Sequence, residues 1–434
     1  MAIAAPNSTT ALSTSGNGQS YGVPLATVTT LFFMWGFLTC LNDILVPHLK
    51  SIFDLNYTRV MLIQFAFFGA YFIFSIPSAR IIDMIGYQRS MVAGLLTMGL
   101  GAFLFVPAAS VPSYPLFLGA LIVLAAGITC LQVAANPYVT VLGKPETASS
   151  RLNLTQAFNS LGTFLAPFFG GLLILSAAPK TADQIRAMAP DAALAYRLHE
   201  AATVKTPYVG LGIALVLLAV AIGSFKLPTI EHAQHKVGEK VDDSIWHHPN
   251  LVFGAIAIFV YVGAEVSIGS FLVNYFAQPE IGGLTEKVAA SFVAFYWGGA
   301  MVGRFIGSAL LQKVKTGSLL GLCAVCAAAL VGISMMTNGH FAMYSIILVG
   351  FFNSIMFPSI FTLGVAELGP LTGDGSGIMI MAIVGGAIIP VAQGWIADHI
   401  GIHHAFFLPV ICYLYILFFA LSGSKPNSER RAEA

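Results

Sequence analysis

Residues 250–276 read NLVFGAIAIFVYVGAEVSIGSFLVNYF, and Glu265 is the only charged side chain among them. A helix of about 20 apolar residues spans a bilayer core of roughly 30 Å. This stretch is therefore long enough and apolar enough to cross a membrane as a helix. A membrane β-barrel would instead show segments of about ten residues with alternating hydrophobicity.

Similar runs fill the whole chain of 434 residues, of which 57% are hydrophobic and only 9% are charged. A soluble domain carries about 25% charged residues, so this composition excludes a soluble protein. The sequence predicts an all-α membrane protein with 12 transmembrane helices. The apolar runs lie near residues 24–47, 60–82, 89–109, 114–142, 152–177, 207–227, 250–276, 288–311, 317–337, 341–366, 375–397 and 404–422.

A polar linker divides these runs into two sets of six. We expect a cytoplasmic, disordered tail over 1–23, an N-terminal six-helix bundle over 24–227 and a cytoplasmic linker over 228–249. A C-terminal six-helix bundle over 250–423 and a second cytoplasmic tail over 424–434 would follow. The four histidines and two aspartates of the linker are typical of a solvated loop, and we expect no metal site.

Lysine and arginine are retained on the cytoplasmic side of membrane proteins. Most basic residues fall in the loops that share a side with both termini, so we place both termini in the cytoplasm of a bacterial inner (plasma) membrane. Residues 1–22 contain no Lys or Arg and do not form a signal peptide, which needs a basic segment before its apolar core.

An internal repeat links the two halves. Pro137 and Pro358 are each followed by Leu-Gly at the same spacing. Pro167 and Pro390 are each flanked by glycine five positions before and four after, and they are separated by nearly the same length of chain as the first pair. Proline and glycine bend helices. The halves therefore bend at matching places, which predicts two bundles related by a pseudo-twofold axis along the membrane normal.

The same separation along the chain relates two carboxylates. Asp43 lies in the first apolar run, and Glu265 occupies the matching place in the first run of the second half. A charge in the bilayer interior is costly unless it is paired, hydrated or neutralised. Such acids suit the uptake of a proton on one side and its release on the other, so we expect both residues to couple transport to protons. Arg304, the one basic residue deep in a run, is expected near the cytoplasmic end of its helix.

Uncharged polar residues surround these acids within the apolar runs. Amides both donate and accept hydrogen bonds, as a neutral polyol requires, and aromatic rings suit sugar faces. The same side chains also bond or pack neighbouring helices. The substrate-binding candidates are Asn42, Gln132, Asn136, Gln156, Asn159, Asn274, Asn353, Trp35, Tyr261 and Trp297, with Gln393 and Tyr296 as further members of the set.

The loop between the second and third runs, ARIIDMIGYQRS, contains Asp83, Gly86 and Arg89. An acid at this place caps a neighbouring helix, and the glycine permits a tight turn. These residues are candidates for a conformational latch rather than for a substrate site.

Four stretches, at 32–53, 130–143, 151–171 and 261–276, resemble the fucose permease and glucose/galactose transporter family of the major facilitator superfamily. The resemblance implies sugar uptake coupled to a cation by alternating access. It also implies that Asp43 is the family's proton-coupling acid of the first helix. Ala79 and Met84 replace the usual glycine and basic residue of the superfamily's signature loop, which suggests a weaker latch.

The chain departs from the fucose branch at Gln132, where the fucose permease has a glutamate. Glu265 together with Asn274 looks like the glucose/galactose branch. The resemblance thus favours proton-coupled import of D-glucose or D-galactose. Import of N-acetylglucosamine or another hexose, and coupling to sodium, remain the alternatives.

Other classes of function find little support. The chain has no GxxxxGK[ST] motif, so ATP does not drive uptake. A net charge of +1 gives no basic surface for nucleic acid. A membrane sugar sensor would need a signalling domain, and no nucleophile–base pair indicates an enzyme. We expect a monomer in contact with membrane lipid, with a small sugar as partner and no cofactor besides the coupling ion.

Overall fold

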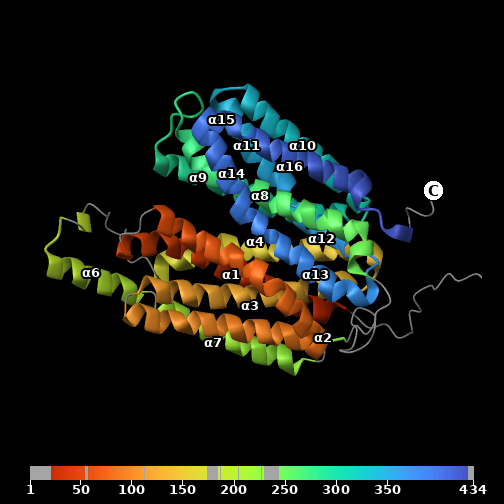
Figure 1. The fold of residues 1–434 in the computed structure, drawn as a ribbon, viewed down its shortest axis with the longest axis horizontal. Coiled ribbons are helices and arrows are strands. Elements are labelled where there is room, and N and C mark those ends of the chain that lie inside the picture. The colour runs from red at the N-terminus through yellow and green to blue at the C-terminus, as the bar shows by residue number, and fades with distance from the viewer. Residues whose placement is uncertain are drawn as a thin grey trace, which may run out of the picture.

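The structure is a computed structural model. It describes residues 21–53, 57–111, 113–173, 184–185, 187–203, 205–225, 227–228 and 244–428, and these residues form the bundle of helices shown in Figure 1. Within this part of the chain, nine helices are long and apolar enough to cross a membrane. One of the nine contains two spans, as shown next.

The N-terminal half contains α1 (Gly22–Phe53), α2 (Tyr57–Ser110), α3 (Tyr114–Val141), η1 (Pro145–Thr147), α4 (Ala148–Leu173), α6 (Pro190–Thr203) and α7 (Lys205–Ser224). Helix α2 covers the second and third predicted spans. Gly86 separates them with backbone angles of φ 82° and ψ 166°, a conformation that glycine adopts without steric cost. Six spans result, as the hydropathy of the sequence predicts.

The C-terminal half begins with η3 (Ile245–His247), α8 (Pro249–Ala277), α9 (Glu286–Leu310) and α10 (Thr316–Met336). Its last three spans are interrupted. The fourth span consists of α11 (Gly339–Asn353) and α12 (Met356–Gly364). The fifth consists of η4 (Gly369–Leu371), α13 (Thr372–Met381), η5 (Ala382–Val384) and α14 (Gly385–Ile400), and the sixth of α15 (Ile402–Ala405), α16 (Phe407–Phe418) and η6 (Phe419–Gly423). The total of twelve spans agrees with the prediction.

Helix α6 lies between the fifth and sixth apolar runs, where hydropathy predicts no membrane span. Pro190 occupies its first position and Asp191 its first turn, which are recognised signals of a helix start. Because α6 is polar and lies outside the apolar runs, a search for hydropathy alone misses it.

The repeat seen in the sequence is also a repeat of packing. A β-carbon added to Gly162 of α4 would lie 2.2 Å from the carbonyl oxygen of Phe33 on α1. Gly385, its counterpart in the repeat, would place a β-carbon 2.0 Å from the carbonyl oxygen of Phe259 on α8. Only glycine permits backbones this close, so each half packs its first and fifth spans in the same way.

The two halves meet at the end of the molecule where α7 ends, α8 begins and the C-terminus lies (Figure 1). We call this end the linker end. Residues at the start of α4 face the ends of α9 and α12, while Ser376 of α13 donates to the carbonyl of Val133 on α3 at 2.9 Å. We call the contact surface between the two halves at this end the seam. Its hydrogen bonds include those of Ser149 with Thr362 (2.6 Å) and Thr316 (3.0 Å), of Ser150 with the Ser308 carbonyl (2.7 Å), and of Asn153 with the Arg304 carbonyl (2.7 Å).

Candidate functional site

Glu265 projects from the middle of α8 and is partly buried. Tyr261 lies one turn earlier on the same helix. Its hydroxyl is 2.9 Å from Glu265 Oε1 and 3.0 Å from the carbonyl oxygen of Asn353. The acid is thus hydrogen-bonded within its own half and connected, through one hydroxyl, to the break between α11 and α12.

Asn353 is fully buried at the end of α11. Its amide nitrogen donates to the hydroxyl of Tyr296 on α9 at 2.8 Å, and its amide oxygen accepts from the hydroxyl of Tyr413 on α16 at 2.8 Å. Both ends of the side chain are therefore occupied by the protein itself. This geometry gives Asn353 a structural task in the conformation described.

Gln132 of α3 is the counterpart of Asn353 in the N-terminal half, at the same separation along the chain as Pro137 and Pro358. Its amide nitrogen donates to the hydroxyl of Tyr71 on α2 at 2.7 Å, which repeats the bond from Asn353 to Tyr296. Its amide oxygen, however, has no hydrogen-bond partner among the described residues. A buried acceptor without a partner costs about 1–3 kcal/mol, so a ligand that supplied a donor here would relieve that cost.

Neighbouring amides of the N-terminal half show the same deficit. Asn136 is fully buried, and neither atom of its amide is paired within the described part of the chain. The amide nitrogen of Gln156 on α4 is likewise unpaired. Asn159, one turn along α4, donates to the carbonyl of Phe32 on α1 at 2.9 Å and is only half-buried.

The remaining candidates are distributed around these centres. Trp35 of α1 is half-buried beside Phe32, at 5.4 Å between ring centroids. Trp297 of α9 is 42% exposed and meets the ring of Tyr296 edge-on at 5.1 Å. Asn274 near the end of α8 is exposed. Gln393 of α14 is fully buried, and both atoms of its amide lack a partner among the residues described.

Asn42 and Asp43 lie on α1, but their side chains fall outside the part of the chain that the structure describes. The expected equivalence of Asp43 and Glu265 in the two halves therefore stays a prediction.

Arg304 is a member of the site that the sequence analysis did not connect with Glu265. It lies on α9, six positions before the end of that helix, and its guanidinium interacts electrostatically with the Glu265 carboxylate. Its Nε donates to the Ser354 carbonyl at 3.3 Å, and another guanidinium nitrogen donates to Ser160 of α4 in the opposite half. No spacing along the sequence could reveal the interaction of Arg304 with Glu265, because it depends on how α9 packs against α8.

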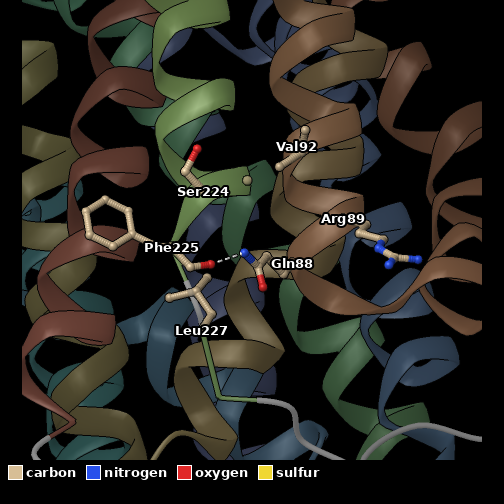
Figure 2. A pocket seen from close by; sticks show the side chains of 7 residues that line it. Gln88, Arg89, Val92, Ser224, Phe225 and Leu227 are labelled. Carbon is tan, nitrogen blue, oxygen red and sulfur yellow. Dashed lines mark hydrogen bonds between the residues drawn. The ribbon is translucent and has the colours of Figure 1, made fainter.

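The three latch candidates separate in space. Asp83 Oδ1 lies 3.5 Å from where a β-carbon would stand on Gly373, in the first turn of α13. Arg89 is exposed and lines a cavity of about 520 Å³ between α2 and the end of α7. Figure 2 shows Arg89 pointing away from this contact while Gln88 donates to the carbonyl of Phe225 at 2.6 Å. Asp83 thus faces the other half.

Twelve spans in two repeated halves, joined at one end, with buried polar groups on both sides of the seam, define a membrane transporter. The family model of the Major Facilitator Superfamily matches residues 26–383, and the chain belongs to this superfamily.

Named relatives match nearly the whole chain. The chain is 53% identical over 425 residues to a glucose/galactose transporter of Brucella abortus biovar 1 (strain 9-941), covering 98% of this chain and 100% of the relative. It is 37% identical over 413 residues to the L-fucose-proton symporter of Escherichia coli (strain K12), covering 94% of both. A crystal structure of the transporter FucP in the outward conformation matches with a TM-score of 0.86 and 35% identity, over 94% of this chain and 100% of that one.

Proposed function

We propose that this protein imports a neutral hexose, D-glucose or D-galactose, together with protons, by alternating access between its two halves. The observation that carries the proposal is the buried amide oxygen of Gln132, which accepts no hydrogen bond from the described residues. The amide oxygen of its counterpart, Asn353, accepts one from Tyr413. A sugar hydroxyl supplies the missing donor. The names of the relatives, glucose/galactose transporter and L-fucose-proton symporter, support the same substrate class and coupling ion.

The sugar is held mainly by the N-terminal half in this proposal. Gln132, Asn136 and Gln156 offer unpaired amide atoms, while Asn159 and the tryptophans Trp35 and Trp297 are at least partly exposed. Asn42 and Asn274 complete the proposed set. Asn353 and Tyr261 hold neighbouring spans together by hydrogen bonds and so position the site. Movement of the halves brings the covered amides within reach of the sugar.

Asp43 and Glu265 are the proposed proton sites. A proton from outside neutralises the acid, the sugar binds, and the halves rock so that the site opens inward. Proton and sugar each raise the affinity for the other because both favour the loaded state. With both termini in the cytoplasm, the linker end faces inward. A closed seam at that end is consistent with an outward-facing state, the conformation named for the FucP structure. Residues 24–227 and 250–423 are the two moving units, within a monomer.

Uptake into proteoliposomes tests this function. Radiolabelled glucose is supplied under an imposed pH gradient and, separately, a sodium gradient, with galactose, N-acetylglucosamine and fucose as competitors. We expect accumulation that the pH gradient drives and galactose blocks. Accumulation with sodium alone would replace the coupling ion, and transport of N-acetylglucosamine without glucose would replace the substrate.

The coupling role of Asp43 has its own test in the same vesicles. Asp43→Asn removes the exchangeable proton, so accumulation against a gradient is expected to disappear while exchange of internal for external sugar continues. Accumulation by the Asp43→Asn variant at the wild-type level would show that Asp43 is not the coupling site.

A further inference from the structure

Pro358 leaves one backbone carbonyl in the break between α11 and α12 without its helical hydrogen-bond donor. Proline has no N–H, so the carbonyl four residues earlier, that of Ser354, loses its helical donor. Arg304 supplies the replacement, with Nε at 3.3 Å from that oxygen. The same guanidinium donates to Ser160 across the seam. One side chain thus joins the break of this span to the opposite half of the molecule.

Tyr261 contacts the same break from the other side. Its hydroxyl reaches both Glu265 Oε1 and the carbonyl oxygen of Asn353, the residue before Ser354. A tyrosine hydroxyl has a single proton to donate. An ionised carboxylate is a stronger acceptor than a carbonyl, so it accepts the hydrogen bond from the Tyr261 hydroxyl. A protonated carboxyl instead donates to the tyrosine oxygen and leaves the tyrosine proton for the Asn353 carbonyl.

Charge gives the connection a direction. The groups that act on Glu265 are Tyr261 on its own helix, Tyr296 and Arg304 on α9, and Tyr413 on α16. Arg304 is the cation of this set. With Glu265 ionised, its negative charge favours the guanidinium of Arg304 in the seam. With Glu265 neutral, the guanidinium loses this favourable interaction and stays a partly buried charge, which is costly. An opening seam relieves that cost by admitting water.

We propose that Arg304 and Tyr261 transmit the charge of Glu265 to the seam: the ionised acid holds the linker end closed, and the neutral acid releases it. Arg304 and Tyr261 are positioning residues here, since neither needs to contact the sugar. As a step of the transport cycle this inference rests on the proposed function. As a statement about the seam it does not, because the opening can be measured without sugar.

The test measures the separation of the halves at the linker end in lipid nanodiscs. Glu146 near the start of α4 and Lys313 just after α9 are exposed and lie in different halves. Spin labels on cysteines at these two positions, with the five native cysteines replaced, report the distance distribution by pulsed electron paramagnetic resonance. We expect Glu265→Gln to raise the ratio of open to closed molecules by about fivefold or more. Tyr261→Phe should raise it in the same direction, because it removes the hydrogen bond that favours the ionised form of Glu265.

Matched variants separate this relay from general loosening. Tyr415→Phe removes a tyrosine hydroxyl bonded to the Phe253 carbonyl in the same half and is expected to leave the distribution unchanged. Arg80→Gln removes the exposed repeat counterpart of Arg304 and serves the same purpose. Arg304→Gln should open the seam by itself. Adding Glu265→Gln to Arg304→Gln should then produce no further opening, since coupled residues are not additive.

Equal distributions for wild type, Glu265→Gln and Tyr261→Phe would overturn the proposal. So would additive opening by Glu265→Gln and Arg304→Gln, because the acid would then act without the arginine. Failure of glucose uptake under every gradient would reject the proposed function, yet leave the distance result standing. The two failures are therefore distinguishable.

Discussion

Gln132 in the N-terminal half and Asn353 in the C-terminal half are the same position of an internal repeat, and they differ in one hydrogen bond. Each donates to a tyrosine, Tyr71 or Tyr296, at almost the same distance. The oxygen of Asn353 then accepts from Tyr413, whereas that of Gln132 has no partner in the described part of the chain. The comparison suggests that one half completes a rigid polar network and the other leaves it open for a ligand.

The prolines behind these amides extend the comparison. Pro137 and Pro358 each deprive a carbonyl of its donor, that of Val133 and that of Ser354. Ser376 from the opposite half satisfies the first, and Arg304 from the same half satisfies the second. Equivalent prolines thus leave carbonyls with unequal partners: a neutral hydroxyl in one half and a charged guanidinium in the other.

The largest effect is expected where the halves are most alike. Gly162→Ala and Gly385→Ala would each place a β-carbon about 2 Å from a carbonyl oxygen of the neighbouring helix. We expect each to lower stability by about 3 kcal/mol or more, seen as loss of folded protein and a lower Tm in detergent. Gly119→Ala, with nothing within 4 Å of the added carbon, is the control. Tolerance of the substitution in only one half would break the structural equivalence.

The two amides should respond unequally to the same change. Asn353→Leu leaves the hydroxyls of Tyr296 and Tyr413 without this partner, and we expect a loss of about 2–4 kcal/mol in stability. Gln132→Leu removes one hydrogen bond, to Tyr71, together with an acceptor that is already unpaired, so Tm should fall less than for Asn353→Leu while the KM for sugar rises about tenfold or more. Thermal unfolding and uptake kinetics on both variants check the pattern. A similar loss of stability at both positions would contradict it.

A smaller asymmetry concerns the latch. Asp83 faces the N-terminal turn of α13, where a negative charge is favourable by about 0.3–1 kcal/mol. The positions that match Asp83 in the repeat of the C-terminal half, residues 304–307, include no acid. Asp83→Asn should lower the ratio of closed to open molecules at the linker end about two- to fivefold, measured with the same pair of spin labels. Asp398→Asn, an exposed acid on α14, should have no effect. An unchanged closed fraction for Asp83→Asn would remove Asp83 from the latch.

The sequence predicts the spans well because crossing a bilayer imposes length and hydropathy on every one of them. It also predicts the polar positions, since an amide such as Gln132 is conspicuous in an apolar run. It does not separate a paired amide from an unpaired one. Tyr413 was not identified, because a tyrosine in an apolar run looks the same whether it packs, lines an interface or completes a network. Arg304 was identified as deep in its helix, but its approach to Glu265 depends on how α9 packs against α8.

The seam between the halves consists largely of serine and threonine hydroxyls, from Ser149 and Ser150 to Thr316 and Thr362. A neutral hydrogen bond of this kind contributes only about 1 kcal/mol net, because water replaces it when the surfaces part. In the proposed alternating-access cycle, the open and closed arrangements are then close in free energy. Exchange between them would be rapid, and a small bound solute would decide which state prevails.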